Sequence, residues 1–348
     1  MDIINLMNDY NAVAHPRVLE ALTGAAGRRF AGYGCDAETA AAAALVRELT
    51  DLPDADVHFL AGGTQTNLTA AGAFLRPHEA VIAPATAHVN VHETGAIEAG
   101  GHKVLIFPAG DGKATLEDVR AIIKAHTDEH MVKPKLLLLS QTTELGTVYT
   151  RAELGALRKT CDEYGLYLYI DGARLGCALK SDACDMNLKE FAGFGDAFYI
   201  GGTKNGLLFG EALVIRNPAL KSDFRYLIKQ RGGLLAKGFL LGIQFRAILE
   251  DGLYFELARQ ANRAAARLSQ GLVSLGIPLL ADTVSNQVFP IVDEAALRRL
   301  EERVLFERWG AGSGKGTPIR FVTTWQTTSE EIDAVLACAS CNQTTTGQ

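Results

Sequence analysis

Lys204 is the residue whose surroundings point most directly to chemistry. It stands in the glycine-flanked turn Gly201-Gly-Thr-Lys-Asn-Gly206, just after the apolar stretch Ala197–Ile200. Asp171 closes a second apolar stretch, Leu166–Ile170. If both stretches are strands of one sheet, an amine and a carboxylate open into the same cleft, as pyridoxal phosphate (PLP) chemistry requires. The alternatives are a solvated loop lysine and a helix-capping aspartate.

An earlier glycine-rich turn can hold a phosphate. The predicted strand Asp56–Leu60 is followed by a helical pattern at Leu68–Phe74, and Gly63, Thr64 and Gln65 stand between the two. Free N–H groups and the positive end of a helix dipole bind anions at such a turn. Taken alone this is weak evidence, because any strand-to-helix turn can use glycine.

Two neighbours of the lysine and the aspartate can add contacts. Arg174 follows Asp171 by three residues and offers a planar fork to a phenolate oxygen of the cofactor or to a substrate carboxylate. Thr203 precedes Lys204 and can contact the phosphate. The alternative for Arg174 is a surface arginine.

Composition favours small-molecule chemistry. The chain has 348 residues, a mass of 37.3 kDa, 48% hydrophobic residues and a net charge of -6. Its basic residues are scattered, which argues against nucleic acid and anionic membranes as partners. Neither a signal peptide nor a membrane-spanning run is visible. We therefore expect a soluble, cytoplasmic protein.

Motifs for other chemistries are incomplete. Cys338 and Cys341 form a CxxC without a second ligand pair, and His88 and His92 lack the glutamate of HExxH, so we predict no metal site. The segment Gly310–Thr317 resembles a phosphate loop but lacks its first glycine and its Ser/Thr, and we interpret it as a turn.

The elements that must position these residues alternate between strands and helices. Helices are predicted over Ala37–Leu49, Thr115–His126 and Arg151–Tyr164. The predicted strands are Asp56–Leu60, Ala80–Ala83, Lys103–Phe107, Lys135–Ser140, Leu166–Ile170, Ala197–Ile200 and Glu211–Ile215. This alternation predicts an α/β fold with a mostly parallel sheet covered on both faces.

The remaining third of the chain predicts a smaller α+β unit. Its predicted elements are helices over Lys237–Glu250, Tyr254–Leu275, Glu294–Arg308 and Ser329–Cys338, and strands near Asn286–Val292 and Pro318–Val322. We predict a large cofactor domain over residues 1–240, which includes the N-terminal segment, and a small domain over residues 241–348. The tail 342–348 is expected to be disordered.

Taken together, these motifs resemble those of the low-specificity threonine aldolases, which belong to the aromatic amino-acid β-eliminating lyases of PLP fold-type I. The resemblance runs from Asn8 to Trp325 and rests on Gly62–Asn67, on His88 with Glu93 and Gly95, and on Thr143–Thr147, Asp171–Arg174 and Gly201–Gly206. It implies the α/β fold of the PLP-dependent transferases. It also implies a homodimer or homotetramer whose active sites are shared between subunits.

The resemblance also implies roles for residues that contact the cofactor. Lys204 would form the Schiff base with PLP, Asp171 would bind the pyridine nitrogen, and His88 would stack on the ring. Contacts to the phosphate would come from Gly63, Thr64 and Gln65, completed by Arg231 or Lys237 of a neighbouring subunit.

On the substrate side, the resemblance assigns the amino-acid carboxylate to Arg174 and Arg320, with Asn8 nearby. His130, which precedes a predicted strand, matches a histidine that touches the β-hydroxyl in the family. The implied reaction is retro-aldol cleavage of L-threonine or a related β-hydroxy amino acid to glycine and an aldehyde. The base is His88, His130 or a water molecule held by Glu93.

The chain departs from the family pattern at two places. Thr203-Lys-Asn-Gly206 replaces Ser-Lys-Gly-Leu-Gly, and Asn8 replaces a serine. These changes leave open a PLP-dependent β-elimination or transamination on another amino acid. A nucleotide-binding protein that uses the glycine turns without PLP is the remote alternative.

Overall fold

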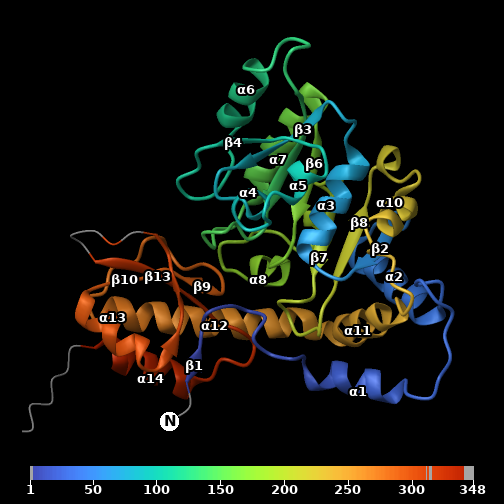
Figure 1. Cartoon of the computed structure of the whole chain (residues 1–348). Coiled ribbons are helices and arrows are strands. Elements are labelled where there is room, and N and C mark those ends of the chain that lie inside the picture. Colours follow the sequence, from blue (N-terminus) through green and yellow to red (C-terminus); the bar gives the residue numbers. More distant parts are fainter. Residues whose placement is uncertain (1–2, 311, 313–315, 341–348) are drawn as a thin grey trace, which may run out of the picture.

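A seven-stranded sheet forms the centre of the computed structural model, which describes residues 3–310, 312 and 316–340 (Figure 1). Its strand order is β2-β8-β7-β6-β5-β3-β4. The strands are β2 (Asp56–Leu60), β3 (Glu79–Pro84), β4 (Val104–Phe107), β5 (Lys133–Ser140), β6 (Tyr167–Asp171), β7 (Ala197–Gly201) and β8 (Glu211–Ile215). All seven predicted strands are confirmed, because their ends differ from the observed ones by at most two residues.

The sheet is mostly parallel, as predicted. Strands β7, β6, β5, β3 and β4 pair in parallel, whereas β8 is antiparallel to both of its neighbours, β2 and β7. Because β8 runs in the opposite direction, its first residue, Glu211, lies at the edge where the parallel strands end. There Glu211 pairs with Leu60 on one side and with Gly201 on the other.

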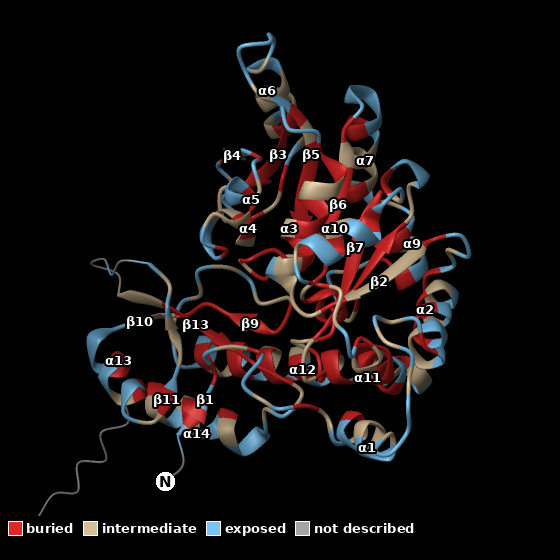
Figure 2. Cartoon of the chain, turned by 45° about the vertical axis from the view of Figure 1, so that its right-hand side comes forward, coloured by how far each residue is buried: buried red, intermediate tan, exposed pale blue. Residues whose placement is uncertain are grey.

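Helices cover both faces of this sheet, and alternate strand residues point to opposite faces. Leu137 and Leu139 belong to one core, together with side chains of α2, α6, α7, α9 and α11. Leu136 and Leu138 belong to the other, with α3, α5 and α10. Figure 2 shows the buried strands between these partly exposed helices.

The helices of the sheet unit include all those predicted there. Helix α3 begins at Gly63, earlier than the predicted start at Leu68, so the phosphate turn lies at its first residues. The helices are α1 (Pro16–Gly24), α2 (Ala37–Thr50), α3 (Gly63–Phe74), α4 (His88–Val91), α5 (Ala96–Ala99), α6 (Leu116–Lys124), α7 (Arg151–Tyr164), α8 (Leu175–Leu179), α9 (Leu188–Ala192), α10 (Phe224–Gln230) and α11 (Phe239–Leu249).

The long helix α12 runs from the sheet unit into a smaller α+β unit (Figure 1). There β13 pairs antiparallel with β9, β10 and β12, and α12, α13 and α14 share one core with these strands. The elements are α12 (Leu253–Ser274), β9 (Gln287–Val288), β10 (Ile291–Val292), α13 (Glu294–Glu301), β11 (Val304–Leu305), β12 (Glu307–Arg308), β13 (Thr317–Val322) and α14 (Ser329–Ala339). The predicted helix Glu294–Arg308 is wrong in its second half, because β11 pairs with the N-terminal strand β1 and β12 pairs with β13, the next strand along the chain.

The N-terminal segment joins the two units. Strand β1 (Ile4–Asn5) pairs in parallel with β11, and Ile4 and Leu6 lie in the core of the small unit. Helix α1 packs against α11 on the sheet unit. The predicted large domain therefore shares its first residues with the small unit, and the division after residue 240 stays a prediction.

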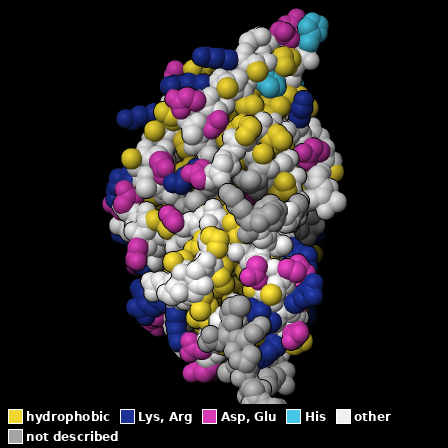
Figure 3. All heavy atoms as spheres, turned by 90° about the vertical axis from the view of Figure 1, so that its left-hand side faces the viewer, with side chains coloured by type: hydrophobic (Ala, Val, Ile, Leu, Met, Phe, Trp, Pro, Cys, Tyr) yellow, Lys and Arg dark blue, Asp and Glu magenta, His cyan; other side chains and the backbone are white. Residues whose placement is uncertain are grey.

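The surface and the search for other kinds of site give the following results. Basic and acidic side chains are interspersed on the face that Figure 3 shows. Within the described part of the chain, we find no helix with the length and apolarity that crossing a membrane requires, and no group of three or more His, Cys, Asp or Glu side chains that could hold a metal ion. Cys341, the tail 342–348 and residues 311 and 313–315 of the predicted turn lie outside the described residues.

Candidate active site

A cavity of about 270 Å³ opens where the parallel strands end. Its walls come from the turns after β2, β6 and β7, from the start of β8, from α4 and from the N-terminal segment. Seven of the predicted site residues line it: Gly63, Thr64, His88, Glu93, Asp171, Thr203 and Lys204. The sheet therefore brings together most of the predicted cofactor site.

Two glycines let the ends of β6 and β7 approach each other. A Cβ on Gly172 would lie 1.8 Å from the carbonyl oxygen of Tyr199, and a Cβ on Gly201 would lie 2.4 Å from that of Ala173. Backbone atoms cannot give way at such distances, so only glycine fits at both positions. These glycines explain the sequence motifs around Asp171 and Lys204, because they allow the two turns to face one cavity.

The carboxylate of Asp171 is held from three sides. Its Oδ1 accepts hydrogen bonds from the Tyr199 hydroxyl at 2.5 Å and from the Ala173 amide at 2.9 Å. Its Oδ2 accepts one from Asn67 Nδ2 at 2.9 Å. Asn67 is in turn fixed by the hydroxyl of Tyr169, which donates to Asn67 Oδ1 at 3.0 Å. A buried carboxylate oriented in this way can receive a hydrogen bond from a protonated ring nitrogen.

His88 and Glu93 form a hydrogen-bonded pair beside this carboxylate. His88 Nδ1 lies 2.8 Å from Glu93 Oε1, and Asn67 Nδ2 donates to the same oxygen at 2.9 Å. The second oxygen, Oε2, is buried without a protein partner. Burial alone would lower the pKa of His88, but the hydrogen bond to the Glu93 carboxylate and the charges of Glu144 and Asp171 raise it above its usual value. The imidazole of His88 is therefore a stronger base than an ordinary histidine side chain.

The amine of Lys204 forms no ion pair with the described residues. Its side chain is half-buried and lines the cavity, and the described part of the chain offers it no salt bridge. Its positive charge lowers the pKa of Asp9, opposes protonation of His88 and lowers the pKa of Glu211. This arrangement suits a lysine that bonds covalently to a carbonyl carbon.

Thr203 is hydrogen-bonded to the buried carboxylate of Glu211, a residue to which the sequence analysis assigned no role. Its hydroxyl donates to Glu211 Oε1 at 2.7 Å, and Thr203 Oγ1 accepts from the Gly210 amide at 2.9 Å. Glu211 Oε2 accepts from the Gly202 amide at 3.0 Å. Burial raises the pKa of Glu211 to about 8 despite these hydrogen bonds. While its proton points to Glu211, the Thr203 hydroxyl does not donate to a phosphate, so the predicted contact needs this proton to turn and stays a prediction.

The predicted phosphate turn is the uncapped N-terminus of α3. Its N-cap, Gly62, offers no side-chain hydrogen bond, so the first-turn N–H groups are left for a ligand. The Gln65 side chain points elsewhere: its Oε1 accepts from the Ala61 amide at 3.3 Å, and its Nε2 donates to the Arg231 carbonyl at 3.4 Å. The Gln65 side chain therefore fixes the turn, and the predicted phosphate contact of Gln65, which its backbone N–H could make, stays a prediction.

The two basic residues predicted to complete the phosphate site do not line the cavity of their own chain. The Arg231 guanidinium packs on α3, where a Cβ on Gly72 would lie 2.0 Å from Nη2. Lys237 is exposed in the turn before α11. Their predicted action in a neighbouring subunit stays a prediction, and Lys237 is the better placed because it faces solvent.

Arg174 forms a buried ion pair with the N-terminal segment. Its Nε and Nη2 donate to the two carboxylate oxygens of Asp9 at 2.7 and 3.1 Å. Asn286 Nδ2 donates to Asp9 Oδ2 at 2.9 Å. Burial would raise the pKa of Asp9, but the charges of Arg174 and Lys204 and these hydrogen bonds lower it.

Arg320 lies near Arg174 but is less fully paired. It stacks on Trp309, with 4.7 Å between the guanidinium carbon and the ring centre, and contacts Gln287 and Glu307. Its Nε is buried and finds no hydrogen-bond partner among the residues that the structure describes. Burial and the charge of Arg174 lower the pKa of Arg320. The two arginines flank the cavity without lining it.

Two predicted substrate contacts are absent from the cavity. His130 is exposed in the turn before β5, at the opposite end of that strand from Ser140, which pairs with Asp171. Within one chain it therefore lies away from the cavity, because parallel strands present their carboxyl ends to the site, and its predicted substrate contact stays a prediction. Asn8 uses its Oδ1 to accept from the Tyr10 amide at 3.1 Å, and Tyr10 lines the cavity instead.

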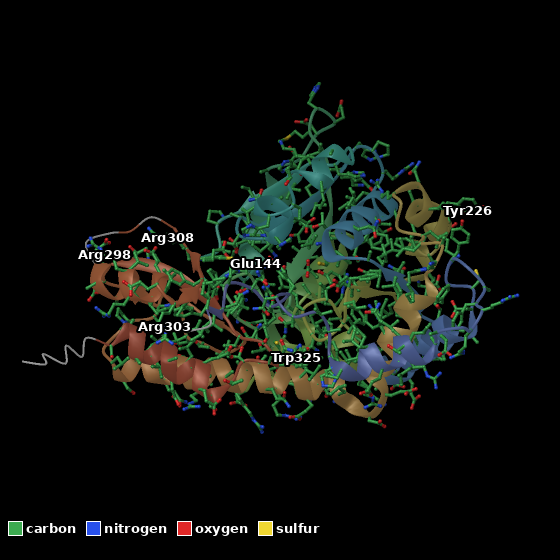
Figure 4. All side chains as sticks on the ribbon, turned by 60° about the horizontal axis from the view of Figure 1, so that its bottom comes forward. Glu144, Tyr226, Arg298, Arg303, Arg308 and Trp325 are labelled. Carbon is green, nitrogen blue, oxygen red and sulfur yellow. The ribbon has the colours of Figure 1, made fainter. Side chains whose placement is uncertain are left out.

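Glu144 lines the cavity and was missed as a functional residue. It is only 7% exposed, and its charge raises the pKa of both His88 and Arg174. Figure 4 places it at the junction of the sheet unit and the small unit. Its position directly after β5 was the available signal, since the end of β5 lies beside the end of β6.

Comparisons with known proteins agree with this geometry. The family model described as beta-eliminating lyase matches residues 6–295. The chain belongs to the beta-eliminating lyase family. The lyase is 35% identical over 303 residues to a low-specificity L-threonine aldolase of Pseudomonas aeruginosa, with 86% of each chain covered. A second such enzyme, from a Pseudomonas species, is also 35% identical, with 88% of each chain covered.

Solved structures resemble the lyase over nearly its whole length. A threonine aldolase of Leishmania major has a TM-score of 0.95 and 46% sequence identity, with 96% of this chain and 98% of that chain covered. An aspartate aminotransferase of Thermus thermophilus has a TM-score of 0.71 at 19% identity, covering 97% of this chain and 91% of that one, and is similar in fold alone. The predicted α/β fold of the PLP-dependent transferases is therefore confirmed.

Proposed function

We propose that this lyase depends on PLP and cleaves L-threonine or a related β-hydroxy amino acid into glycine and an aldehyde. One observation carries the proposal: an uncommitted lysine, an oriented buried carboxylate and an uncapped helix N-terminus line one cavity. The relatives named as threonine aldolases support the choice of reaction.

The donor set fits the proposed cofactor. Lys204 would bond to its aldehyde carbon, Asp171 would bind its ring nitrogen, and the first turn of α3 would hold its phosphate. His88 would cover the ring, with Glu93 fixing the imidazole at 2.8 Å. When bound, PLP supplies an electron sink for the carbon–carbon bond that breaks.

The chain itself must orient the substrate and move a proton. Arg174 and Arg320 are positioned to attract the amino-acid carboxylate, and Arg320 has an unpaired Nε for it. Two groups in the cavity, the imidazole of His88 and the carboxylate of Glu144, can accept the proton of the β-hydroxyl group. With His130 outside the cavity, Glu144 takes its place among the candidate bases.

The oligomer and the compartment extend this proposal. Tyr10, which lines the cavity, is 58% exposed, and Val13, in the same N-terminal segment, is 70% exposed. These exposed side chains support a homodimer or homotetramer in which a neighbouring subunit covers the N-terminal segment and closes the site. We expect this assembly to act in the cytoplasm. Light scattering of the purified chain tests the assembly, and a monomer would contradict it.

Spectroscopy and product analysis together test the proposed function. Purified lyase with added PLP should be yellow, and borohydride should fix the cofactor on Lys204, where mass spectrometry of the peptide can locate it. Incubation with a panel of β-hydroxy amino acids should then release glycine and aldehyde. Ammonia with a 2-oxo acid would favour β-elimination, and a protein that stays colourless with PLP would contradict the cofactor itself.

A further inference from the structure

Glu211 is a carboxylate buried inside the proposed cofactor site. It is 3% exposed and lines the cavity. In the sheet it pairs with Leu60, directly before the phosphate turn, and with Gly201, three residues before Lys204. The carboxylate therefore lies between the turn that would hold the phosphate and the lysine that would hold the aldehyde carbon.

An ionised Glu211 is a poor neighbour for a phosphate. The phosphate of the cofactor is itself anionic, and it would repel the like charge of a buried carboxylate nearby. The ionised carboxylate also accepts the hydrogen bond of the Thr203 hydroxyl, which donates to Glu211 Oε1 at 2.7 Å. The turn then loses a hydrogen-bond donor that stands beside it.

A proton on Glu211 Oε1 removes both difficulties. Glu211 would then donate to Thr203 Oγ1 across the same 2.7 Å, while its Oε2 continues to accept from the Gly202 amide at 3.0 Å. Thr203 Oγ1 would accept both this hydrogen bond and that of the Gly210 amide at 2.9 Å, which uses its two lone pairs. Its own hydroxyl proton becomes free to point into the cavity.

We propose that Glu211 is a cofactor-binding residue that acts in its protonated form, turning the Thr203 hydroxyl toward the phosphate of PLP. Binding of the phosphate transfers one proton from solvent to Glu211 Oε1 whenever the carboxylate is ionised beforehand. This inference rests on the proposed PLP dependence and assigns a chemical role to the segment in which the chain departs from the family pattern.

The charged surroundings of Glu211 agree with this role. Burial favours the neutral carboxyl, Asp171 adds to that effect, and Lys204 opposes it together with the hydrogen bonds from Thr203 and Gly202. The charge of Glu211 also acts on three buried hydroxyls, those of Tyr169, Tyr199 and Tyr254. The balance raises the pKa of Glu211 to about 8, so the carboxyl is mostly protonated at neutral pH, and the phosphate needs to favour its protonation only at mildly alkaline pH.

Cofactor affinity as a function of pH tests the proposal. The dissociation constant of PLP is measured for the apo form of the full chain between about pH 6 and about pH 10. In parallel, pyridoxal, which lacks the phosphate but keeps the aldehyde, reports on all ionisations that do not involve the phosphate. The ratio of the two constants isolates the effect of the phosphate. In the wild type this ratio should change about tenfold per pH unit above about 8, with PLP losing affinity.

Two variants locate the effect. Glu211→Gln keeps the shape and can donate to Thr203 at all pH values, so its ratio should be flat and its PLP affinity at about pH 9.5 at least tenfold above that of the wild type. Thr203→Val should weaken PLP binding and remove most of the benefit of Glu211→Gln in the double variant. The exposed change Glu163→Gln, at the surface pair with Arg120, is the matched control and should behave as the wild type.

A direct proton count gives a second readout. In weakly buffered solution at about pH 9, PLP binding should take up about one more proton in the wild type than in Glu211→Gln. Equal pH dependence in these two proteins would overturn the proposal. The proposal would also be overturned if Glu211→Gln removed the same pH dependence from the dissociation constants of PLP and of pyridoxal. The carboxylate would then act on Lys204 and not on the phosphate. Failure of the wild type to bind PLP at all would instead refute the proposed function.

Discussion

Glu144 brings a carboxylate to the cavity beside His88 and the two arginines. If it accepts the β-hydroxyl proton, Glu144→Gln should lower kcat for aldol cleavage by about 10²–10⁴-fold, because the amide cannot take up a proton. The visible colour of bound PLP should persist. Exchange of the α-proton of glycine, which needs no β-hydroxyl, should fall much less.

The surface variant Glu163→Gln is the control for Glu144→Gln, since it removes the same charge from an exposed pair. Cleavage rates and glycine exchange are measured on the same preparations. An unchanged kcat in Glu144→Gln would assign the proton transfer to His88. An equal loss of both reactions would show that Glu144 only maintains the site.

Glu211 should also make the stability of the cofactor-free protein depend on pH. Its pKa rises on folding from an ordinary value near 4.5 to about 8, so its contribution is full at low pH and is lost as pH rises toward about 8. Glu211→Gln removes this loss. Its free energy of unfolding should exceed that of the wild type by about 1–3 kcal/mol at pH 9 and by much less at pH 4. Urea unfolding at both pH values measures the difference, and a constant difference would contradict the buried carboxylate.

At the scale of single residues, some roles were readable from the sequence and others were not. Lys204 and Asp171 were readable because each follows an apolar strand and parallel strands end at one edge. Glu144 obeys the same rule but was overlooked. Glu211 breaks the rule, since it stands at the start of its strand, and only the reversed direction of β8 brings it to the site.

At the scale of elements, a substitution at Gly172 tests how closely β6 and β7 must approach each other. Gly172→Ala places a Cβ 1.8 Å from the Tyr199 carbonyl oxygen, so the turn after Asp171 has to move. We expect stability to fall by about 3 kcal/mol and PLP affinity to fall at least tenfold. Thermal unfolding and PLP titration measure the two effects.

Gly24→Ala is the matched control for this change. Gly24 ends α1, and a Cβ there would meet no atom within 4 Å. Its stability should stay within about 0.5 kcal/mol of the wild type or rise slightly, because alanine favours the helix. Similar behaviour of the two variants would show that the glycine after Asp171 is not required for the strand approach.

The sequence predicted long elements better than short ones. The sheet strands and α7 carry periodic patterns over enough residues to be recognised, and α7 matches its predicted bounds. Helices of four or five residues, such as α4 and α8, hold too few turns for a period. Strands β11 and β12 have two residues each and exist through their partners β1 and β13, so local sequence predicted a longer α13 instead.

At the scale of the whole molecule, Asp9 connects three parts of the chain through its contacts with Arg174 and Asn286. It belongs to the N-terminal segment, its partner Arg174 begins α8 on the sheet unit, and Asn286 precedes β9 in the small unit. Asp9→Asn leaves the buried guanidinium without a counter-charge, so we expect a loss of about 3–5 kcal/mol in the free energy of unfolding. Urea unfolding at neutral pH measures it.

The pH dependence of this ion pair has a definite sign. The pKa of Asp9 is lowered in the folded protein, so its stabilisation is present above the ordinary value of 3.8 and is lost as pH falls through the folded value. The difference between the wild type and Asp9→Asn should therefore shrink in acid. Asp333→Asn, at an exposed pair with Arg267, should cost at most about 1 kcal/mol. A neutral Asp9→Asn would contradict the buried pair.

The reversed strand β8 also sets the order in which the site can be assembled during synthesis. Strand β2, which precedes the phosphate turn, has β8 as its single neighbour in the sheet. Until residue 215 has left the ribosome, β2 has no partner strand with which to form hydrogen bonds, although more than half of the chain has already been made. We therefore expect the nascent chain to bind the proposed cofactor only after the late hairpin of β7 and β8 has formed.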